Sequence, residues 1–476
     1  KNNLMESVVE FYSYLSIVMV SIIFFIIVYR KFSKSKLSFE NYIIDRNNID
    51  TSNSVNTLTS SVLGAWILFS PAEAGTWSGI NGIFGYSIGQ ALPFLAFVFI
   101  GPKLRSLFPK GFSVTEFVNF RYGNFANIIV GIISVFYMVV FLCAELTGIS
   151  SAANLISNIP TWFTALVIGL SVATYVSFAG IKASILTDKY QFRFIFPLIL
   201  AAVLMVFLDI DLSKVFTEQE NNLLSLSNLT VAKFGLTLII AVFSANMFHQ
   251  GLWQRIYSVK NSKSLITSFT ITSVIVIPVI FIFGFIGIIA AGVNTAENPS
   301  IALFDTILKY SSEWTIFAFL LLAILLVSSS LDTLFNSVSS IVGTDLMKII
   351  PHKENYVKLA MKITPYICLI PAIFVVTQGY SVLYLFLIAD MVCAAILFPV
   401  FFGLYTSNFN GRDSVISMII GLFVGSVLFA KPDMSPLIKS IPYSGDLFVS
   451  FYMAFITSTL TALLLYLKNK KTISFK

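Results

Sequence analysis

Apolar runs of roughly twenty residues recur along the whole length of this sequence, and they restrict its fold more than any other feature. A helix of that length crosses the hydrocarbon core of a bilayer while bonding every backbone group within its own segment. Membrane-spanning strands would instead be shorter and would alternate in hydropathy. The sequence therefore predicts an all-α integral membrane protein.

Charge is scarce in the chain, since 11% of its 476 residues are charged and 57% are hydrophobic. A soluble protein of this length needs more charge to cover its surface. Because no polar stretch is long enough for a separate soluble domain, residues 1–476 are predicted to form a single transmembrane domain. The net charge of +7 is explained by basic loops between spans and does not indicate nucleic-acid binding.

About thirteen helical spans are expected from the hydropathy pattern. The first is too long for a signal-peptide core, so it is interpreted as an extra N-terminal membrane helix. The expected spans lie near residues 8–29, 54–79, 81–101, 124–156, 162–180, 191–209, 233–254, 265–292, 314–347, 358–378, 380–405, 412–430 and 446–467.

The basic residues predict the orientation of these spans. If the N-terminus is outside and the spans alternate, the C-terminus is cytoplasmic and most basic residues fall inside, as the positive-inside rule expects for a cell-membrane protein. The expected inside loops hold Arg30, Lys31, Lys34, Lys36, Lys103, Arg105, Lys110, Arg121, Lys182, Lys189, Arg193, Arg255, Lys260, Lys263, Lys348, Lys353, Lys358, Lys362, Arg412, Lys468, Lys470, Lys471 and Lys476. The outside loops hold Lys1, Lys214, Lys309, Lys431 and Lys439, with Lys233 at a span edge.

The residues that commonly hold metals or cofactors are few. Three cysteines, Cys143, Cys368 and Cys393, sit in apolar runs and form no disulfide or metal pattern. Two histidines, His249 and His352, are too few for a histidine-built metal or haem site. Since no nucleophile motif or phosphate loop is found either, no cofactor is expected and an enzyme is not indicated.

Two spans are interrupted by polar or helix-breaking residues. The stretch FSPAEAG at 69–75 breaks the second span, because proline removes a backbone donor, and would free the carbonyls of Phe69 and Ala72. The stretch SANMFHQG at 244–251 breaks the seventh. Paired interruptions at the start of two five-span blocks, 54–209 and 233–405, indicate a transporter built from inverted repeats, with 412–467 as extra C-terminal helices. An ordinary proline kink and a polar helix end are the alternative.

The ninth span carries a row of hydroxyl groups. The side chains of Ser329 and Ser330 offer hard oxygen ligands that suit sodium. Small residues of this kind also serve helix packing, with each hydroxyl bonded to its own backbone. Asp332 in the same segment favours a functional role, because an acid deep in a membrane is costly.

Other polar residues within the spans are candidates for substrate binding. Each buried carboxylate could bind a cationic group, relay a proton or hold a structural hydrogen bond. Asp188, at the inner end of the sixth span, could equally be a solvated helix-end charge. No aromatic residue is assigned to a substrate site. The substrate-binding candidates are Glu73, Gly75, Glu145, Ser244, Asn246, His249 and Asp390.

Four segments give the chain a resemblance to the sodium:solute symporter family, whose members carry proline, sugars, sialic acid, pantothenate or urea. FENYIIDR at 39–46 resembles the segment that precedes the first core helix, and HQGLWQR at 249–255 resembles the Gln-Arg ending of the sixth. AGIKASILTD at 179–188 is similar to a Gly-Gly-x-x-Ala-x-x-x-Thr-Asp element, with Ala179 replacing the first glycine. SSLDTLFNS at 329–337 resembles a Ser-Thr-x-Asp-Ser segment.

The resemblance implies a leucine-transporter-type fold, a five-plus-five inverted repeat with helices added at both ends. It also implies sodium as the coupling ion, a small-molecule substrate and the bilayer as partners, with no obligate protein partner evident. Sodium would be bound through the carbonyls of Phe69, Ala72 and Leu326 and the hydroxyls of Ser329 and Ser330. A second ion site would involve Asp188, Asp332 and Thr333.

The expected substrate is a small polar solute such as urea or an amino acid. Sugar carriers of the family have a tyrosine gate in the seventh span, where this chain has Ala245. The Trp253–Arg255 and Asp390 segments resemble those of urea-type members more closely. A proton-coupled transporter and a non-transporting solute sensor remain alternatives, whereas a channel would need a repeated pore element that is not found.

Overall fold

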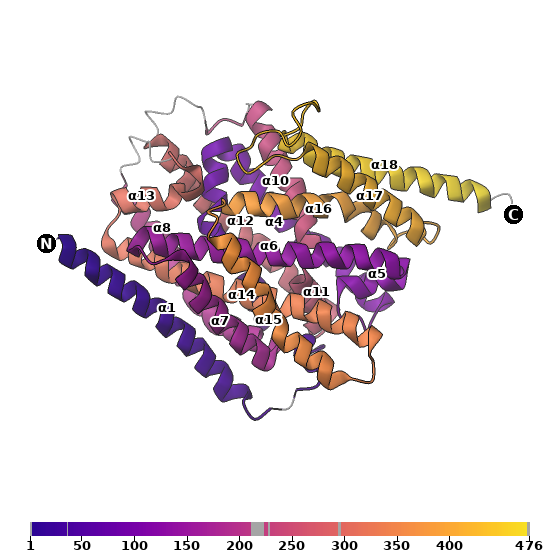
Figure 1. Ribbon diagram of the computed structural model, residues 1–476, viewed down its shortest axis with the longest axis horizontal. Helices are drawn as coiled ribbons and strands as arrows, with labels where there is room; N and C mark the ends of the chain where they lie inside the picture. Colours follow the sequence, from indigo (N-terminus) through magenta and orange to yellow (C-terminus); the bar gives the residue numbers. More distant parts are fainter. Residues whose placement is uncertain (1, 36, 211–222, 227–228, 294–296, 474–476) are drawn as a thin grey trace.

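A computed structural model describes residues 2–35, 37–210, 223–226, 229–293 and 297–473 of the chain as a bundle of long helices (Figure 1). By length and composition, 11 of these helices could cross a membrane, or up to 12 if one bent pair counts as a single span. The predicted all-α integral membrane fold is confirmed. The predicted number of about thirteen spans is approximate.

The helices follow one another along the chain with a few short elements between the long ones. Their bounds are α1 Asn2–Phe32, α2 Phe39–Ile43, α3 Thr51–Val62, η1 Ala65–Leu68, α4 Ser70–Leu107, α5 Val114–Tyr122, α6 Asn124–Ser157, α7 Thr161–Ala179, α8 Ile181–Asp209, α10 Leu229–Met247, α11 Gln250–Ser258, α12 Ser262–Gly292, η2 Pro299–Ile301, α13 Ala302–Tyr310, α14 Glu313–Ile349, α15 Glu354–Val376, α16 Val382–Phe402, α17 Gly411–Leu428 and α18 Leu447–Ile473.

The span count differs from the prediction because of how the second and third expected spans are connected. The stretch expected at 54–79 covers most of α3, then η1 and the first ten residues of α4. Helix α4 then continues through Gly79, whose φ of 52° and ψ of −139° bend it between two helical parts. A residue with a side chain would be strained there, so glycine permits the sharp connection.

Helix α4 packs closely against α10 and α12 because glycines line its contacts. A Cβ on Gly75 would lie 2.2 Å from the Gly284 carbonyl oxygen of α12, and a Cβ on Gly85 would lie 2.1 Å from that of Gly235 on α10. Small residues let membrane helices approach until their backbones touch. The predicted substrate candidate Gly75 therefore lies in a close backbone contact between α4 and α12.

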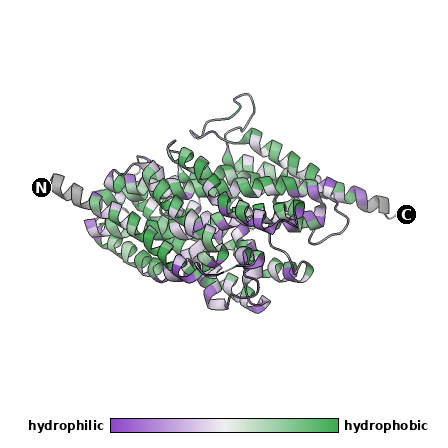
Figure 2. Ribbon diagram, turned by 60° about the horizontal axis from the view of Figure 1, so that its bottom comes forward, coloured by the Kyte–Doolittle hydropathy of each residue, from purple (hydrophilic) through white to green (hydrophobic). Residues whose placement is uncertain are grey.

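The helices differ in how far the protein covers them. Helices α14 and α16 are the most buried of the long apolar helices, whereas α1 and α18 are among the least and leave apolar side chains exposed to lipid. Figure 2 shows hydrophobic residues over most of the bundle. The centre of the molecule, where polar side chains could form a site, thus lies around α14 and α16.

Candidate functional site

The first helix break lies earlier in the chain than predicted. The backbone leaves the helix at Leu63 and Gly64, makes the 3-10 turn η1, and resumes as α4 at Ser70. Pro71 stands in the first turn of α4, where its missing N–H costs nothing and its fixed φ suits the helix. The expected interruption over 69–75 is therefore wrong in position, because the proline begins a helix instead of ending one.

The carboxylate of Glu145 on α6 stabilises this break. Its Oε2 accepts a 2.7 Å hydrogen bond from the backbone N–H of Ala65, the first residue of η1. A Cβ on Gly64 would stand 2.0 Å from Glu145 Oε1, so only glycine leaves room for this side chain. Glu145 Oε1 is buried and has no hydrogen-bond partner among the described residues. The predicted candidate Glu145 thus reaches the unwound backbone directly.

The second break agrees with the prediction. Helix α10 ends at Met247, α11 begins at Gln250, and the two are inclined by 54°. His249 occupies the turn, where its carbonyl accepts from the backbone of Leu252 and its ring lies 5.7 Å from that of Phe141. The Nδ1 atom of His249 is buried without a hydrogen-bond partner among the described residues.

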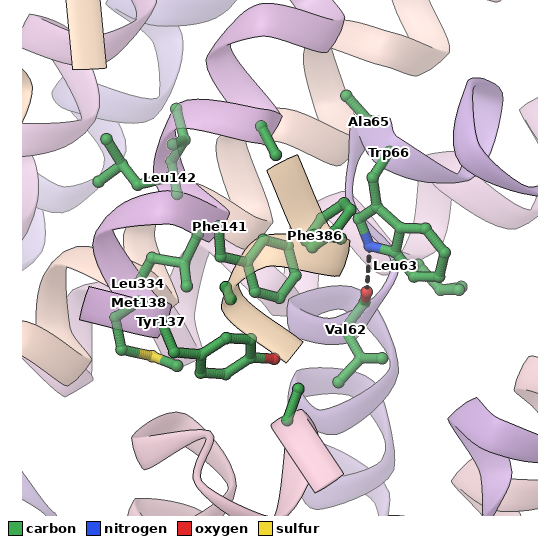
Figure 3. Close-up of a cluster of buried hydrophobic side chains, with 14 of the residues drawn as sticks. Val62, Leu63, Ala65, Trp66, Tyr137, Met138, Phe141, Leu142, Leu334 and Phe386 are labelled. Atoms are coloured by element: carbon green, nitrogen blue, oxygen red, sulfur yellow. Dashed lines mark hydrogen bonds between the residues drawn. The ribbon is translucent and has the colours of Figure 1, made fainter. Parts of the chain in front are cut away.

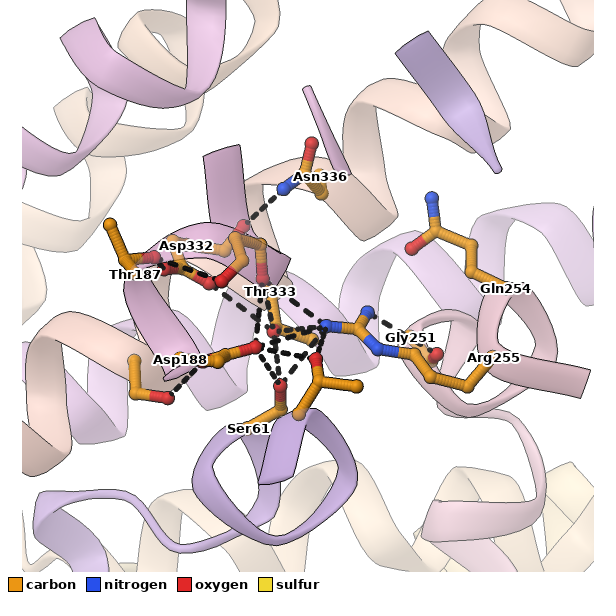
Figure 4. Close-up of polar contacts among 12 residues, drawn as sticks. Ser61, Thr187, Asp188, Gly251, Gln254, Arg255, Asp332, Thr333 and Asn336 are labelled. Atoms are coloured by element: carbon orange, nitrogen blue, oxygen red, sulfur yellow. Dashed lines mark hydrogen bonds and ion pairs between the residues drawn. The ribbon is translucent and has the colours of Figure 1, made fainter. Parts of the chain in front are cut away.

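Arg255 on α11 lies at the centre of a buried polar cluster (Figure 4). Its Nη2 lies 3.6 Å from Asp188 Oδ2 and donates to four hydroxyl groups at 3.0–3.2 Å. Both charged side chains are at most 1% exposed. A buried ion pair of this kind needs such added hydrogen bonds to offset its desolvation. The four hydroxyls belong to Thr57, Ser61, Ser184 and Thr333.

The two acids of this cluster, Asp188 and Asp332, are held by hydroxyl groups from four helices, including that of Tyr175 on α7, which donates to Asp332 Oδ2 at 3.2 Å. Ser329 donates to Asp188 Oδ1 at 2.6 Å, and Thr57 donates to Asp188 Oδ2 at 2.5 Å. Thr187 donates to Asp332 Oδ2 at 2.7 Å. The structure therefore brings together four of the predicted ion-site residues, which are Asp188, Ser329, Asp332 and Thr333.

Two expectations about charges in this region are corrected. Arg255 was expected in an inside loop, but the bend after Met247 turns α11 back into the protein and buries it. Asp188 is fully buried and paired, so the solvated helix-end alternative does not hold. The sequence holds no signal that separates Arg255 from a loop arginine, because its burial depends on the bend between α10 and α11.

The predicted carbonyl ligands lie beside the cluster without converging on it. The carbonyl of Phe69 accepts a 2.9 Å bond from the backbone of Glu73, within the first turn of α4. The carbonyl oxygen of Ala72 faces α12, 2.0 Å from where a Cβ on Gly287 would stand. Leu326 is buried within α14, one turn before Ser330. Ser330 lies beside the Glu145 carboxylate, near the true break.

A small cavity of about 20 Å³ lies between the two breaks and α16. Aromatic rings form much of its wall, and Figure 3 shows Trp66, Tyr137, Phe141 and Phe386 gathered together. The Trp66 ring stacks on Tyr86 at 5.4 Å, and the Phe141 and Phe386 rings meet at 4.8 Å. These aromatic residues had not been assigned to a site, because nothing in their spacing separates them from the other aromatics of the bundle.

The polar lining of this cavity includes two of the predicted candidates. It consists of Gln90, Asn246 and Asp390. Asn246 donates to Gln90 Oε1 at 3.3 Å and to the Val242 carbonyl at 2.9 Å. Asp390 is 4% exposed, and no hydrogen bond or ion pair joins it to another residue in the part of the chain that the structure describes.

The remaining candidates lie outside this cavity. Glu73 is buried in α4 and lies against Ser381 and Leu383, at the N-terminus of α16. Ser244 is buried in α10, and its hydroxyl has no hydrogen-bond partner among the described residues.

Comparison with known proteins identifies the family of this chain. The profile of the sodium:solute symporter family matches residues 42–421. The chain belongs to the sodium:solute symporter family. This confirms the resemblance noted in the sequence, and it makes the protein a multi-pass membrane transporter with a small-molecule substrate.

Two relatives of this symporter are carriers from fungi. It is 24% identical to the spermidine transporter DUR31 of Candida albicans over 382 residues, which are 78% of this chain and 72% of the relative. It is 24% identical to the probable urea active transporter 1 of Schizosaccharomyces pombe over 178 residues, which are 37% of this chain and 26% of that relative.

Solved structures share the fold of this symporter. A sodium-coupled sialic acid symporter in its substrate-bound, outward-open state superimposes with a TM-score of 0.75 at 14% identity, over 95% of this chain and 97% of the other. A nucleobase-cation-symport-1 family transporter in a closed conformation gives 0.58 at 16% identity, over 92% and 96%. The predicted leucine-transporter-type fold is thereby confirmed.

Proposed function

We propose that this protein is a sodium-coupled symporter that imports a small polar solute by alternating access. The observation that carries the proposal is the contact between the unwound segment after α3 and a row of buried hydroxyls on α14. Ser61, two residues before the break, accepts a 2.8 Å hydrogen bond from Thr333 of α14. Free backbone oxygens beside hydroxyl oxygens supply the hard ligands that sodium requires.

We place the main sodium site between the first break and the hydroxyls of Ser329 and Ser330. Its backbone ligands would come from the last turn of α3 and Leu63 instead of Phe69 and Ala72, because the last carbonyls of a helix have no partner within it. The Val62 carbonyl in this turn already accepts from the Trp66 indole N–H at 3.0 Å. Leu326 would supply a carbonyl one turn earlier on α14. Asp188 accepts from Ser329, so a negative charge lies beside the ion.

The second ion site would use Asp332 and Thr333 next to Arg255. Asp188 forms the ion pair with Arg255, while the carboxylate of Asp332 is held by the hydroxyls of Thr187 and Tyr175. A second cation would balance the charge of that second carboxylate. Sodium occupancy of either site would link to solute binding if both favour the same conformation of the two broken helices.

Uptake into proteoliposomes tests this proposal. A panel of labelled solutes (urea, proline, putrescine and spermidine) is offered at fixed pH with external sodium or with potassium. We expect one solute class to accumulate above the bath concentration only when sodium is outside. Accumulation that is indifferent to sodium would contradict sodium coupling, and a pH gradient that drives it would favour proton coupling. No accumulation of any solute would favour the sensor.

We also propose that the protein lies in the cell membrane with its N-terminus outside. The excess of basic residues in the expected inside loops persists after Arg255 is removed from that set. All three cysteines are buried, so single cysteines can be introduced and labelled from one side. We expect Lys439→Cys to react with an impermeant maleimide on intact cells and Lys353→Cys to react only after permeabilisation. The reverse pattern would invert the topology.

A further inference from the structure

We propose that the cavity lined by Trp66, Tyr86, Tyr137, Phe141, Phe386 and Asp390 binds the primary ammonium group of an organic amine. This inference rests on the proposed transport function and specifies its substrate class. The protein would hold the charged head of the solute against Asp390 and surround it with aromatic rings.

The aromatic lining suits a cation. Trp66 stacks on Tyr86 and meets Phe386 edge to face at 6.0 Å, while Phe141 contacts both Tyr137 and Phe386. An ammonium within about 6 Å of an aromatic face is attracted to the negative centre of the ring, and more strongly when water is excluded. Rings on η1, α4, α6 and α16 thus meet around one small space.

Asp390 differs from the two other buried acids near this space. Glu145 accepts from the backbone N–H of Ala65, and Glu73 lies at the N-terminus of α16, where backbone donors favour a carboxylate. Asp390 sits in the middle of α16, far from a helix N-terminus, and no cation faces it among the described residues. Arg255 is already engaged by Asp188 and four hydroxyls.

These surroundings favour an organic cation over a metal ion or a neutral solute. A sodium ion needs several oxygen ligands, whereas most of this wall is aromatic carbon and valine. A neutral solute such as urea could offer the buried Asp390 side chain hydrogen bonds only, whereas an ammonium group also supplies the positive charge that pairs with an ionised carboxylate. The cavity volume of about 20 Å³ holds one group the size of water, which suits –NH₃⁺ better than a quaternary ammonium.

Solute binding to the purified wild-type protein tests the proposal. This test does not depend on whether a substituted variant folds. Calorimetry in a buffer that contains sodium measures the affinity for putrescine and for 1,4-butanediol, which has the same length and no charge. The affinities for tetramethylammonium and urea are measured in the same way. We expect putrescine to bind on the order of 100-fold more tightly than butanediol, because its ammonium group pairs with the buried carboxylate and the butanediol hydroxyl cannot. Equal binding of the two, or tighter binding of urea, would overturn the proposal.

The variant Asp390→Asn then locates the site. We expect it to lose putrescine affinity by a similar factor, with sodium affinity retained. The matched control is Asp413→Asn, which makes the same change at a buried acid on α17 whose carboxylate bonds Asn469. Undiminished putrescine affinity in Asp390→Asn would overturn the proposal, as would an equal loss in the control.

Failure of this inference can be told apart from failure of the proposed function. If wild-type proteoliposomes accumulate urea or proline with sodium and exclude putrescine, the symporter stands and the amine proposal falls. If sodium drives no solute while putrescine binds at Asp390, the amine site stands and sodium coupling falls.

Discussion

The polar cluster around Arg255 and the aromatic cavity around Asp390 each bury an acid, but only the first places a cation of the chain beside it among the described residues. The chain itself supplies a cation to Asp188, together with hydroxyl donors from Thr57, Ser61 and Ser329. No described residue supplies one to Asp390. The difference indicates that the first site holds the protein together around the broken helices, while the second is completed by a ligand.

The largest expected effect comes from removing the internal cation. Arg255→Met should lower the free energy of unfolding by about 3–5 kcal/mol, because it leaves Asp188 buried and uncompensated. Thermal unfolding of the purified protein measures the loss. Replacing both partners, as in Arg255→Met with Asp188→Leu, should recover a large part of it. If the single variant is as stable as the wild type, the cluster around Arg255 does not stabilise the fold and the comparison fails.

A smaller loss is expected where the first break meets Glu145. Gly64→Ala places a Cβ on the carboxyl group and should cost about 1–3 kcal/mol through the lost hydrogen bond to Ala65. The control is Gly131→Ala on the same α6 helix as Glu145, where the new Cβ meets Thr115 at an ordinary 3.5 Å. Equal thermal stability of the two variants would argue against a capping role for Glu145.

The hydroxyls of Ser329 and Ser330 should matter for sodium more than for folding. Ser329→Ala combined with Ser330→Ala is expected to weaken apparent sodium affinity about tenfold, or about 1.4 kcal/mol, measured as the sodium dependence of uptake. Ser328→Ala combined with Ser337→Ala is the matched control, since both hydroxyls bond to their own helix at 2.7 and 2.6 Å. Ser330 likewise donates to Val327 of its own helix at 3.2 Å, whereas Ser329 donates across to Asp188. Unchanged sodium dependence in the first pair would remove the proposed main site.

The smallest expected change in stability is at Asp390. Asp390→Asn breaks no ion pair in the described structure, so its unfolding free energy should stay within about 1 kcal/mol of the wild type. Thermal unfolding measured without solute tests this. A loss as large as that of Arg255→Met would mean that Asp390 has a structural partner and would erase the contrast between the two sites.

Much of the fold was predictable because the membrane enforces regular helices. The apolar runs located most of the long spans within a few residues, but α8 begins ten residues before the expected start at 191 and the span expected at 54–79 is divided among α3, η1 and α4. The polar stretch at 244–251 correctly predicted the α10–α11 break. The first break was misplaced because Pro71 can end one helix or begin another, and only the Gly64–Glu145 contact decides between them. The repeat boundaries 54–209 and 233–405 stay a prediction.

The candidate site was predictable in part, residue by residue. Hydroxyls and acids in apolar surroundings stand out in a sequence, so Ser329, Asp332 and Asp390 could be named. Arg255 could not be separated from loop arginines, since its burial depends on a bend of 54° that brings it onto α3 and α8. The aromatic wall could not be found either, because it forms from rings on four separate elements.

Simultaneous measurement of sodium and solute flux tests the central claim most directly. Proteoliposomes with the membrane potential clamped at zero receive labelled sodium together with the solute that the uptake panel selects. The account predicts that the solute accelerates sodium entry in a fixed ratio, and that Asp390→Asn abolishes this acceleration while the protein stays folded. Solute entry that leaves sodium flux unchanged in the wild type would contradict it.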